Sequence, residues 1–217
     1  ILGSIILQLV KILVMKKLVI ILLSGLFVFS TQLACSRSAD VVDSLTQTEK
    51  NSLQFMREEE KLAHDVYIVL YEKWNLLPFF NIAQSELSHM EAVRTLLYRY
   101  EIPDPVEGKA AGEFVDQTLQ QLYYTLVQKG NISEIEALTV GAMIEEIDIR
   151  DLEEQLADIT RTDIVFVYEN LMRGSRNHLR SFVQNLSLRG VTYVPQYLSV
   201  DEYNSIINSG MEKGGRW

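Results

Sequence analysis

The sequence predicts an all-α protein: an antiparallel four-helix bundle with a short extra helix between helices two and three and a small C-terminal helix. Apolar residues recur at steps of three and four in four long segments, which places them on one face of each helix. The chain has 4 prolines and 11 glycines in 217 residues, too few for the turns of a β-sandwich or for a disordered chain. We find no alternating run long enough to compete as a strand.

Each helix has its own sequence signals. Three capping boxes, in which side chains bind the free backbone N–H groups of a first turn, mark the starts of the first, third and C-terminal helices: Thr46-x-x-Glu49, Ser133-x-x-Glu136 and Ser199-x-x-Glu202. Asn75, Pro103, Gly130 and Gly190 mark helix ends. The stripes of the four long helices span 53–74, 79–100, 135–159 and 164–186, and the extra helix lies around 114–127.

Composition excludes several classes of function. A net charge of −9 argues against a nucleic-acid partner, because phosphate binding needs a surplus of Lys and Arg. Cys35 is the single cysteine, so the chain has neither an internal disulfide nor a cysteine-based metal cage.

The segment 15–35 has the order of an export signal: two lysines, a short apolar run and small residues before Cys35. Leu33-Ala34-Cys35 is similar to a lipobox, so we expect lipid attachment at Cys35 and membrane anchoring through it. Ordinary signal cleavage, with Cys35 incidental, and an uncleaved anchor are the alternatives. The protein is then exported, as a cell-envelope lipoprotein or a periplasmic or extracellular protein.

The remaining segments complete the predicted organisation. We expect residues 1–14 to lie upstream of the natural start, 36–46 to be a linker, 47–208 to be the bundle and 209–217 to be a tail. We expect a monomer or a small homo-oligomer.

Five polar side chains interrupt the apolar stripes near the middle of the helices, so the bundle would bring them to one level of its core: Glu60, Glu86, His89, Glu145 and His178. Buried carboxylates are expensive unless they are paired or bind a metal. Carboxylate and imidazole ligands without thiolates suit Fe, Mn or Zn. The sequence therefore predicts a metal centre formed by two helices that carry Glu and a helix that carries Glu-x-x-His, with a further His on the fourth.

Several stretches carry a family resemblance. FNIAQSELSHM (80–90) and Glu60-x-x-Ala63-x-x-x-Tyr67 resemble the motifs of rubrerythrins and other ferritin-like di-iron carboxylate proteins. MREEEKLAHDVY (56–67), VGAMIEEIDIRDL (140–152) and SRNHLRSF (175–182) resemble the bacterial and archaeal ferritin-like domain family DUF2202. The resemblance covers 47–208 and implies a ferritin-like bundle with two iron ions, or two Mn or Zn ions.

The resemblance assigns the five interrupting side chains to ligand positions, with one departure. Ser175 stands where the fourth helix of the family has Glu. We expect Asp148, one turn after Glu145, to supply the missing carboxylate. A salt bridge from Asp148 to Arg150 or Arg176 is the alternative.

Other polar residues are given weaker roles. Tyr67 and Tyr168 are expected first as core aromatics, with support of the centre or electron relay as the alternative. Four further residues fall beside the stripes and are expected to be solvated: Glu58, Glu59, His64 and Glu146.

Three hypotheses for function follow. The first is a di-iron protein that oxidises Fe(II) or reduces O2 or peroxide, because a pair of ferrous ions can give two electrons to an oxidant. The second is a metal-binding lipoprotein without catalysis. The third is a structural bundle whose buried carboxylates form a hydrogen-bonded network.

Overall fold

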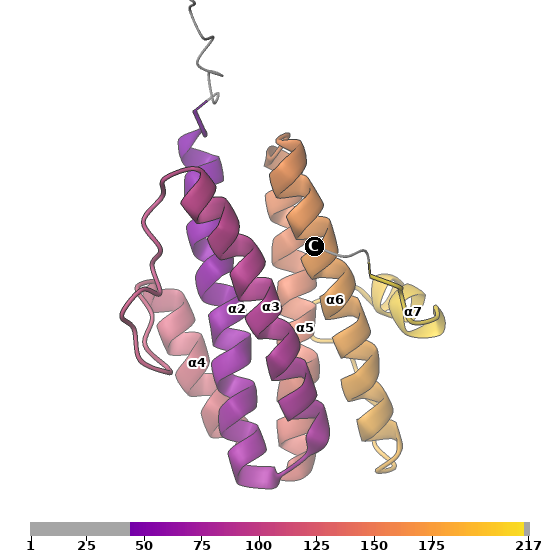
Figure 1. The fold of residues 1–217 in the computed structure, drawn as a ribbon. Helices are drawn as coiled ribbons and strands as arrows, with labels where there is room; N and C mark the ends of the chain where they lie inside the picture. Colours follow the sequence, from indigo (N-terminus) through magenta and orange to yellow (C-terminus); the bar gives the residue numbers. More distant parts are fainter. Residues whose placement is uncertain (1–43, 215–217) are drawn as a thin grey trace, which may run out of the picture. The chain divides into compact units, whose positions relative to one another are not determined.

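The computed structural model describes residues 44–214, and every regular element in that part of the chain is an α-helix (Figure 1). The prediction of an all-α fold is confirmed there. The four long helices pack side by side, α4 lies against α2 and α5, and α7 packs on α6. The helices are α2 (Gln47–Trp74), α3 (Leu77–Arg99), α4 (Gln117–Gly130), α5 (Glu134–Asp158), α6 (Thr162–Ser187) and α7 (Val200–Asn208).

The predicted capping residues stand at the helix ends. At α2 both halves of the capping box form, because Thr46 accepts from the Glu49 N–H and the Glu49 carboxylate accepts from the Thr46 N–H. Ser133 and Ser199 accept from the third N–H of α5 and α7. Asn75 ends α2 in the left-handed region, at φ 52°, where Asn is tolerated better than most residues.

One long connection, residues 100–133, sets the topology. It runs along α2 from one end to the other, because Pro103 accepts a hydrogen bond from Gln54 near the start of α2 and Gly130 accepts one from Trp74 at its end. The chain therefore enters α5 at the end where α2 stops. The contacting pairs of long helices, α2 with α3, α5 with α6, α2 with α5 and α3 with α6, are all antiparallel.

The extra helix begins later than the stripe around 114–127 predicts. Asp116 caps α4 by accepting from the N–H groups of Thr118 and Leu119, so the helix starts at Gln117. Phe114 lies before the helix, although its side chain is buried in the core. Phe114 fits the apolar stripe because its side chain packs in the core, although its backbone is not helical.

The apolar core is divided by a polar layer. One cluster includes Leu53 and Val93 and lies toward the start of α2, and the other includes Tyr67 and Phe182 and lies toward its end. The predicted interrupting side chains fall between these clusters on all four long helices. The fold therefore places them at one level, as the stripes predict.

The predictions for 1–14, the signal 15–35, Cys35 and most of the linker lie outside the described residues. Within 44–214, we find no helix long and apolar enough to cross a membrane.

Candidate metal centre

The polar layer gathers two groups of potential metal ligands. Glu60, Glu86 and His89 offer donor atoms within 4.8 Å of one another, and Glu86, Glu145 and His178 do the same. All five predicted interrupting side chains are thus brought together. Glu86 on α3 belongs to both groups, which makes its carboxylate a candidate bridge between two ions.

The imidazoles approach the carboxylates through their Nδ1 atoms. His89 Nδ1 lies 2.7 Å from Glu86 Oε2 and 3.1 Å from Glu60 Oε2. His178 Nδ1 lies 2.9 Å from Glu86 Oε1 and 3.5 Å from Glu145 Oε2. The spacing of Glu86 and His89, one turn apart on α3, brings both side chains to the same face.

Several of these short separations lack the alignment of a hydrogen bond. Among the described residues, no hydrogen-bond partner meets Glu60 Oε1, either oxygen of Glu86, Glu145 Oε2 or His178 Nδ1. Buried polar atoms are nearly always bonded, so each exception needs an explanation. His89 Nδ1 does form a hydrogen bond with Glu60 Oε2. The five atoms without a partner nonetheless converge with it, and a set of carboxylate oxygens and imidazole nitrogens fits a divalent transition-metal ion.

The pKa values show how strongly the centre holds protons when no cation competes. Burial raises the pKa of Glu60 to about 7. Although burial opposes it, the carboxylates of Glu86 and Glu145 raise the pKa of His178 to about 10, and Glu86 and Glu60 raise the pKa of His89 well above its usual value. Burial alone would raise the pKa of Glu86, but His178 and His89 hold it below its ordinary range. A metal would have to displace protons from the imidazoles.

Neighbouring side chains fix the orientation of the candidate ligands. Tyr67, fully buried, donates to Glu145 Oε1 at 2.5 Å. Burial raises the pKa of Tyr67 well above its usual value, so the phenol stays a donor. Ser85 Oγ lies 3.1 Å from Nε2 of His178, which leaves Nδ1 facing the carboxylates.

The fourth helix departs from a symmetric centre at Ser175. Its hydroxyl donates to the Leu171 carbonyl, one turn back on α6, rather than to a carboxylate. Asp148 is 2% exposed, and neither of its oxygens has a hydrogen-bond partner within 44–214. Burial, Glu59 and Glu145 raise its pKa well above the usual value. Asp148 thus lies beside the centre, although it is not a member of either three-residue group.

The alternative of a salt bridge from Asp148 is wrong. Arg150 donates to Asp151, and Arg176 donates to Glu212. Both guanidinium groups point to partners nearer the surface, which leaves Asp148 with the acids of the polar layer.

The expectation of solvated carboxylates at Glu58 and Glu146 is also wrong. Glu58 accepts from the N–H groups of Val115 and Asp116, at 2.5 and 3.1 Å, and so holds the residues that precede α4. Glu146, fully buried, accepts from the Tyr193 hydroxyl and from the N–H groups of three consecutive residues that precede α7, Gln196, Tyr197 and Leu198.

The same expectation fails for Glu59, for a different reason. Glu59 is 1% exposed, and we find no hydrogen-bond partner for its oxygens in the described part of the chain. Burial, together with Asp151, raises its pKa well above the usual value. Glu59 is therefore buried without the backbone donors that satisfy Glu58.

Two other residues have their polar partners outside the five candidate ligands. Tyr168 is a buried core aromatic whose hydroxyl lies 2.9 Å from that of Ser52. His64 is partly buried and turns to Asp65, at 2.9 Å between Nδ1 and Oδ1.

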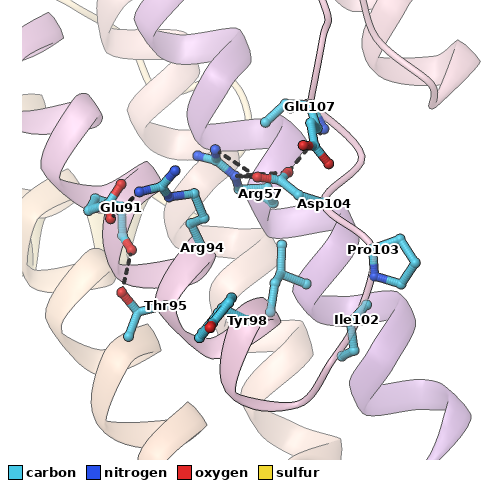
Figure 2. Close-up of a pocket in the computed structure, with 11 residues that line it drawn as sticks. Arg57, Glu91, Arg94, Thr95, Tyr98, Ile102, Pro103, Asp104 and Glu107 are labelled. Atoms are coloured by element: carbon cyan, nitrogen blue, oxygen red, sulfur yellow. Dashed lines mark hydrogen bonds and ion pairs between the residues drawn. The ribbon is translucent and has the colours of Figure 1, made fainter.

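A separate surface hollow of about 650 Å³ lies near the start of α2 and the end of α3. Figure 2 shows that its arginines are already paired, Arg57 with Asp104 and Arg94 with Glu91. The exposed Tyr98 is another of the residues that line it. The hollow therefore has fewer unpaired polar groups for binding a ligand than the polar layer.

Comparison with known proteins gives the family. The model of an uncharacterized protein domain, DUF2202, matches residues 49–210. The chain is 53% identical to the uncharacterized protein MJ0754 of Methanocaldococcus jannaschii over 170 residues, which is 78% of this chain and 92% of that protein. The crystal structure of hypothetical protein MJ0754 superposes with a TM-score of 0.76 over 77% of this chain and 96% of that one. The chain belongs to the DUF2202 family.

Proposed function

We propose that the protein is a ferritin-like di-metal protein whose centre, loaded with iron, oxidises Fe(II) or reduces O2 or peroxide. The observation that carries this proposal is the sharing of Glu86 by two groups of buried donor atoms. A carboxylate common to two groups can bridge two ions, whereas a hydrogen-bonded network would leave fewer of these oxygens without partners.

The topology supports the ferritin-like assignment. Four long helices connected by two short turns and one long crossover are the arrangement of ferritin-like bundles. The Glu86-x-x-His89 pair on α3, with Glu60 on α2 and Glu145 on α5, also follows the pattern of di-iron carboxylate proteins.

Charge balance supports a pair of divalent ions. Glu60, Glu86, Glu145 and Asp148 bring four negative charges when they are ionised, and two divalent cations bring four positive charges. With both imidazoles neutral, as metal ligands must be, the centre is then uncharged. A single ion would leave two buried charges uncompensated, which costs several kcal/mol unless protons remain.

The candidate ligands would be distributed over the two ions as follows. Glu60 and His89 would hold one ion, Glu145 and His178 the other, and Glu86 would bridge them. A bound ferrous pair supplies two electrons to an oxidant, which Zn or Mg does not. Tyr67 keeps Glu145 oriented through its hydroxyl, and Ser85 keeps Nδ1 of His178 directed inward.

A second candidate function is metal binding without catalysis, and Ser175 is the observation that favours it. Because a serine replaces the second Glu-x-x-His carboxylate, the group on α5 and α6 has fewer carboxylates than a symmetric centre. For the chain's location we propose export and a lipid anchor, on the sequence of 15–35 alone.

Metal analysis of the anaerobically purified protein tests the centre. We expect about two iron ions per chain and an optical change on exposure to O2 or peroxide. Glu86→Ala should remove most bound metal, because it deprives both groups of a ligand. Glu91→Ala, on the same helix but exposed at the surface, is the matched control and should keep its metal. Equal metal content in the two variants would contradict the proposed centre, and bound iron without the optical change would favour metal binding without catalysis.

A further inference from the structure

Buried acids around the centre fall into two kinds. Glu58 and Glu146 are satisfied by backbone N–H groups. Glu59 and Asp148 are as deeply buried, but among the described residues their four carboxylate oxygens have no hydrogen-bond partner. A buried carboxylate without donors is stable only when it takes up a proton or a cation.

These unsatisfied acids form a line with a third acid nearer the surface. Glu145, Asp148 and Asp151 are spaced by three residues on α5, so they follow one stripe at a rise of about 4.5 Å per step. Glu59 on α2 lies beside that stripe, since the Asp151 carboxylate acts electrostatically on Glu59, and Glu59 acts in the same way on Asp148. We call Glu59, Asp148 and Asp151 the acid ladder.

The two ends of the acid ladder differ in exposure. The Asp151 side chain is 15% exposed and pairs with Arg150 at 2.7 Å, and the Arg150 side chain is 40% exposed. At the inner end, Asp148 acts electrostatically on Glu145, Glu60 and Glu86 of the centre. The acid ladder thus leads from solvent to the candidate metal ligands between α2 and α5.

We infer that the acid ladder is a cation-binding relay, by which divalent first-row metal ions pass from solvent to the centre. Its carboxylate oxygens are suited to a partly hydrated ion in transit, since oxygen ligands without imidazole bind such ions more weakly than the mixed ligand set of the centre. Arg150 covers the outer end, and its exposed side chain can leave Asp151 when a cation arrives. The inference rests on the proposed function, because a relay requires a centre to fill.

The rate of metal loading tests the relay separately from activity. Metal-free protein is mixed with Co2+ in a stopped-flow instrument, and the visible absorption of bound Co2+ is followed. Glu59→Gln and Asp151→Asn should each slow loading by about tenfold, the lower end of the range for electrostatic steering of ions. The final amount of bound Co2+ should be that of the wild type, and Glu59→Asp, which keeps the carboxylate, should restore most of the rate.

Glu154→Gln is the matched control. It removes one acid from α5, close to the same guanidinium, since Glu154 lies 3.9 Å from Arg150 and its side chain is 70% exposed. The relay predicts an unchanged loading rate for this variant. If circular dichroism shows that Glu59→Gln does not fold, the loading rate of Asp151→Asn, at the more exposed end of the acid ladder, tests the relay instead.

The outcomes separate the relay from the centre. If Glu59→Gln and Asp151→Asn load at the wild-type rate, the relay is wrong, while the centre stands. If wild-type protein binds no Co2+, or Glu86→Ala binds as much as wild type, the proposed centre is wrong and the relay falls with it.

Discussion

The His89 ring lies directly against the backbone of Gly174. A Cβ atom at position 174 would stand 2.7 Å from both Nε2 and Cε1 of His89. Real Cβ atoms essentially never approach another heavy atom so closely. A glycine inside α6 costs about 1 kcal/mol of helix stability relative to alanine, so its place here is explained by the room that it leaves for His89 on α3.

The first prediction concerns this contact. Gly174→Ala should push the imidazole of His89 away from Glu60 and Glu86 and weaken metal binding by about ten- to a hundredfold, as changes that reorient a ligand do. Titration of the metal-free variant with Co2+ measures the affinity. Gly210→Ala, where an added Cβ meets nothing within 4 Å, is the control and should bind as wild type does. Equal affinities for the two variants would show that His89 is not a ligand.

The second prediction concerns pH and the metal-free protein. Glu60 has a folded-state pKa raised from 4.5 to about 7, and His178 one raised from 6.5 to about 10. For both groups the folded protein binds more protons than the unfolded chain. Their stabilisation is therefore complete below the unfolded pKa and is lost as the pH rises through the folded pKa. The metal-free protein should lose about 1.4 kcal/mol per pH unit between pH 4.5 and about 7 because of Glu60, and again between pH 6.5 and about 10 because of His178.

Thermal unfolding at a series of pH values checks this prediction. Because ligand atoms must be deprotonated to bind a metal, the loaded protein should gain stability as the pH rises toward neutrality. The melting temperature should thus fall with pH without metal and rise with it. Parallel slopes in the two series would mean that metal and protons do not compete for these side chains.

The sequence predicted the helices and the polar layer well, and the reason is local. Apolar spacing and caps such as Thr46 act within one helix, so periodicity alone identifies the face that carries Glu60 and Glu145. It could not place Glu58, Glu59 or Glu146, because each of these depends on a second covering element. The helix α2 is covered by α3, α4 and α5, and α5 by α2, α4, α6 and the residues before α7. Nearly the whole circumference of α2 and of α5 is therefore buried at the level of the polar layer, whereas an apolar stripe identifies only one buried face of a helix.

The third prediction concerns Glu146 and the segment that it holds. Glu146→Ala would leave the N–H groups of Gln196, Tyr197 and Leu198 without their acceptor. Since a hydrogen bond to a charged group contributes about 1.5–3 kcal/mol, we expect the free energy of unfolding to fall by about 3 kcal/mol or more. Urea denaturation measures the loss, and limited proteolysis should cut within 189–199 faster. Glu154→Ala, exposed on the same helix, should change neither. A loss below about 0.5 kcal/mol, the usual size for a surface substitution, would contradict the anchoring role.

The last prediction asks whether Asp148 compensates for Ser175. Asp148 pairs with neither Arg150 nor Arg176, and its oxygens lie in the polar layer without hydrogen-bond partners from the described residues. If it supplies the fourth negative charge of the centre, Asp148→Asn should lower the metal content from about two ions per chain toward one and slow any reaction with peroxide, because both require the second ion. Ser175→Glu in that background re-creates a Glu-x-x-His pair with His178 on α6 and should partly restore the second ion. Metal analysis of the two variants and of the wild type measures the number of ions per chain directly. A wild type that holds one ion, unchanged in Asp148→Asn, would rule out the di-metal centre and leave a single-ion site on Glu86 as the better account.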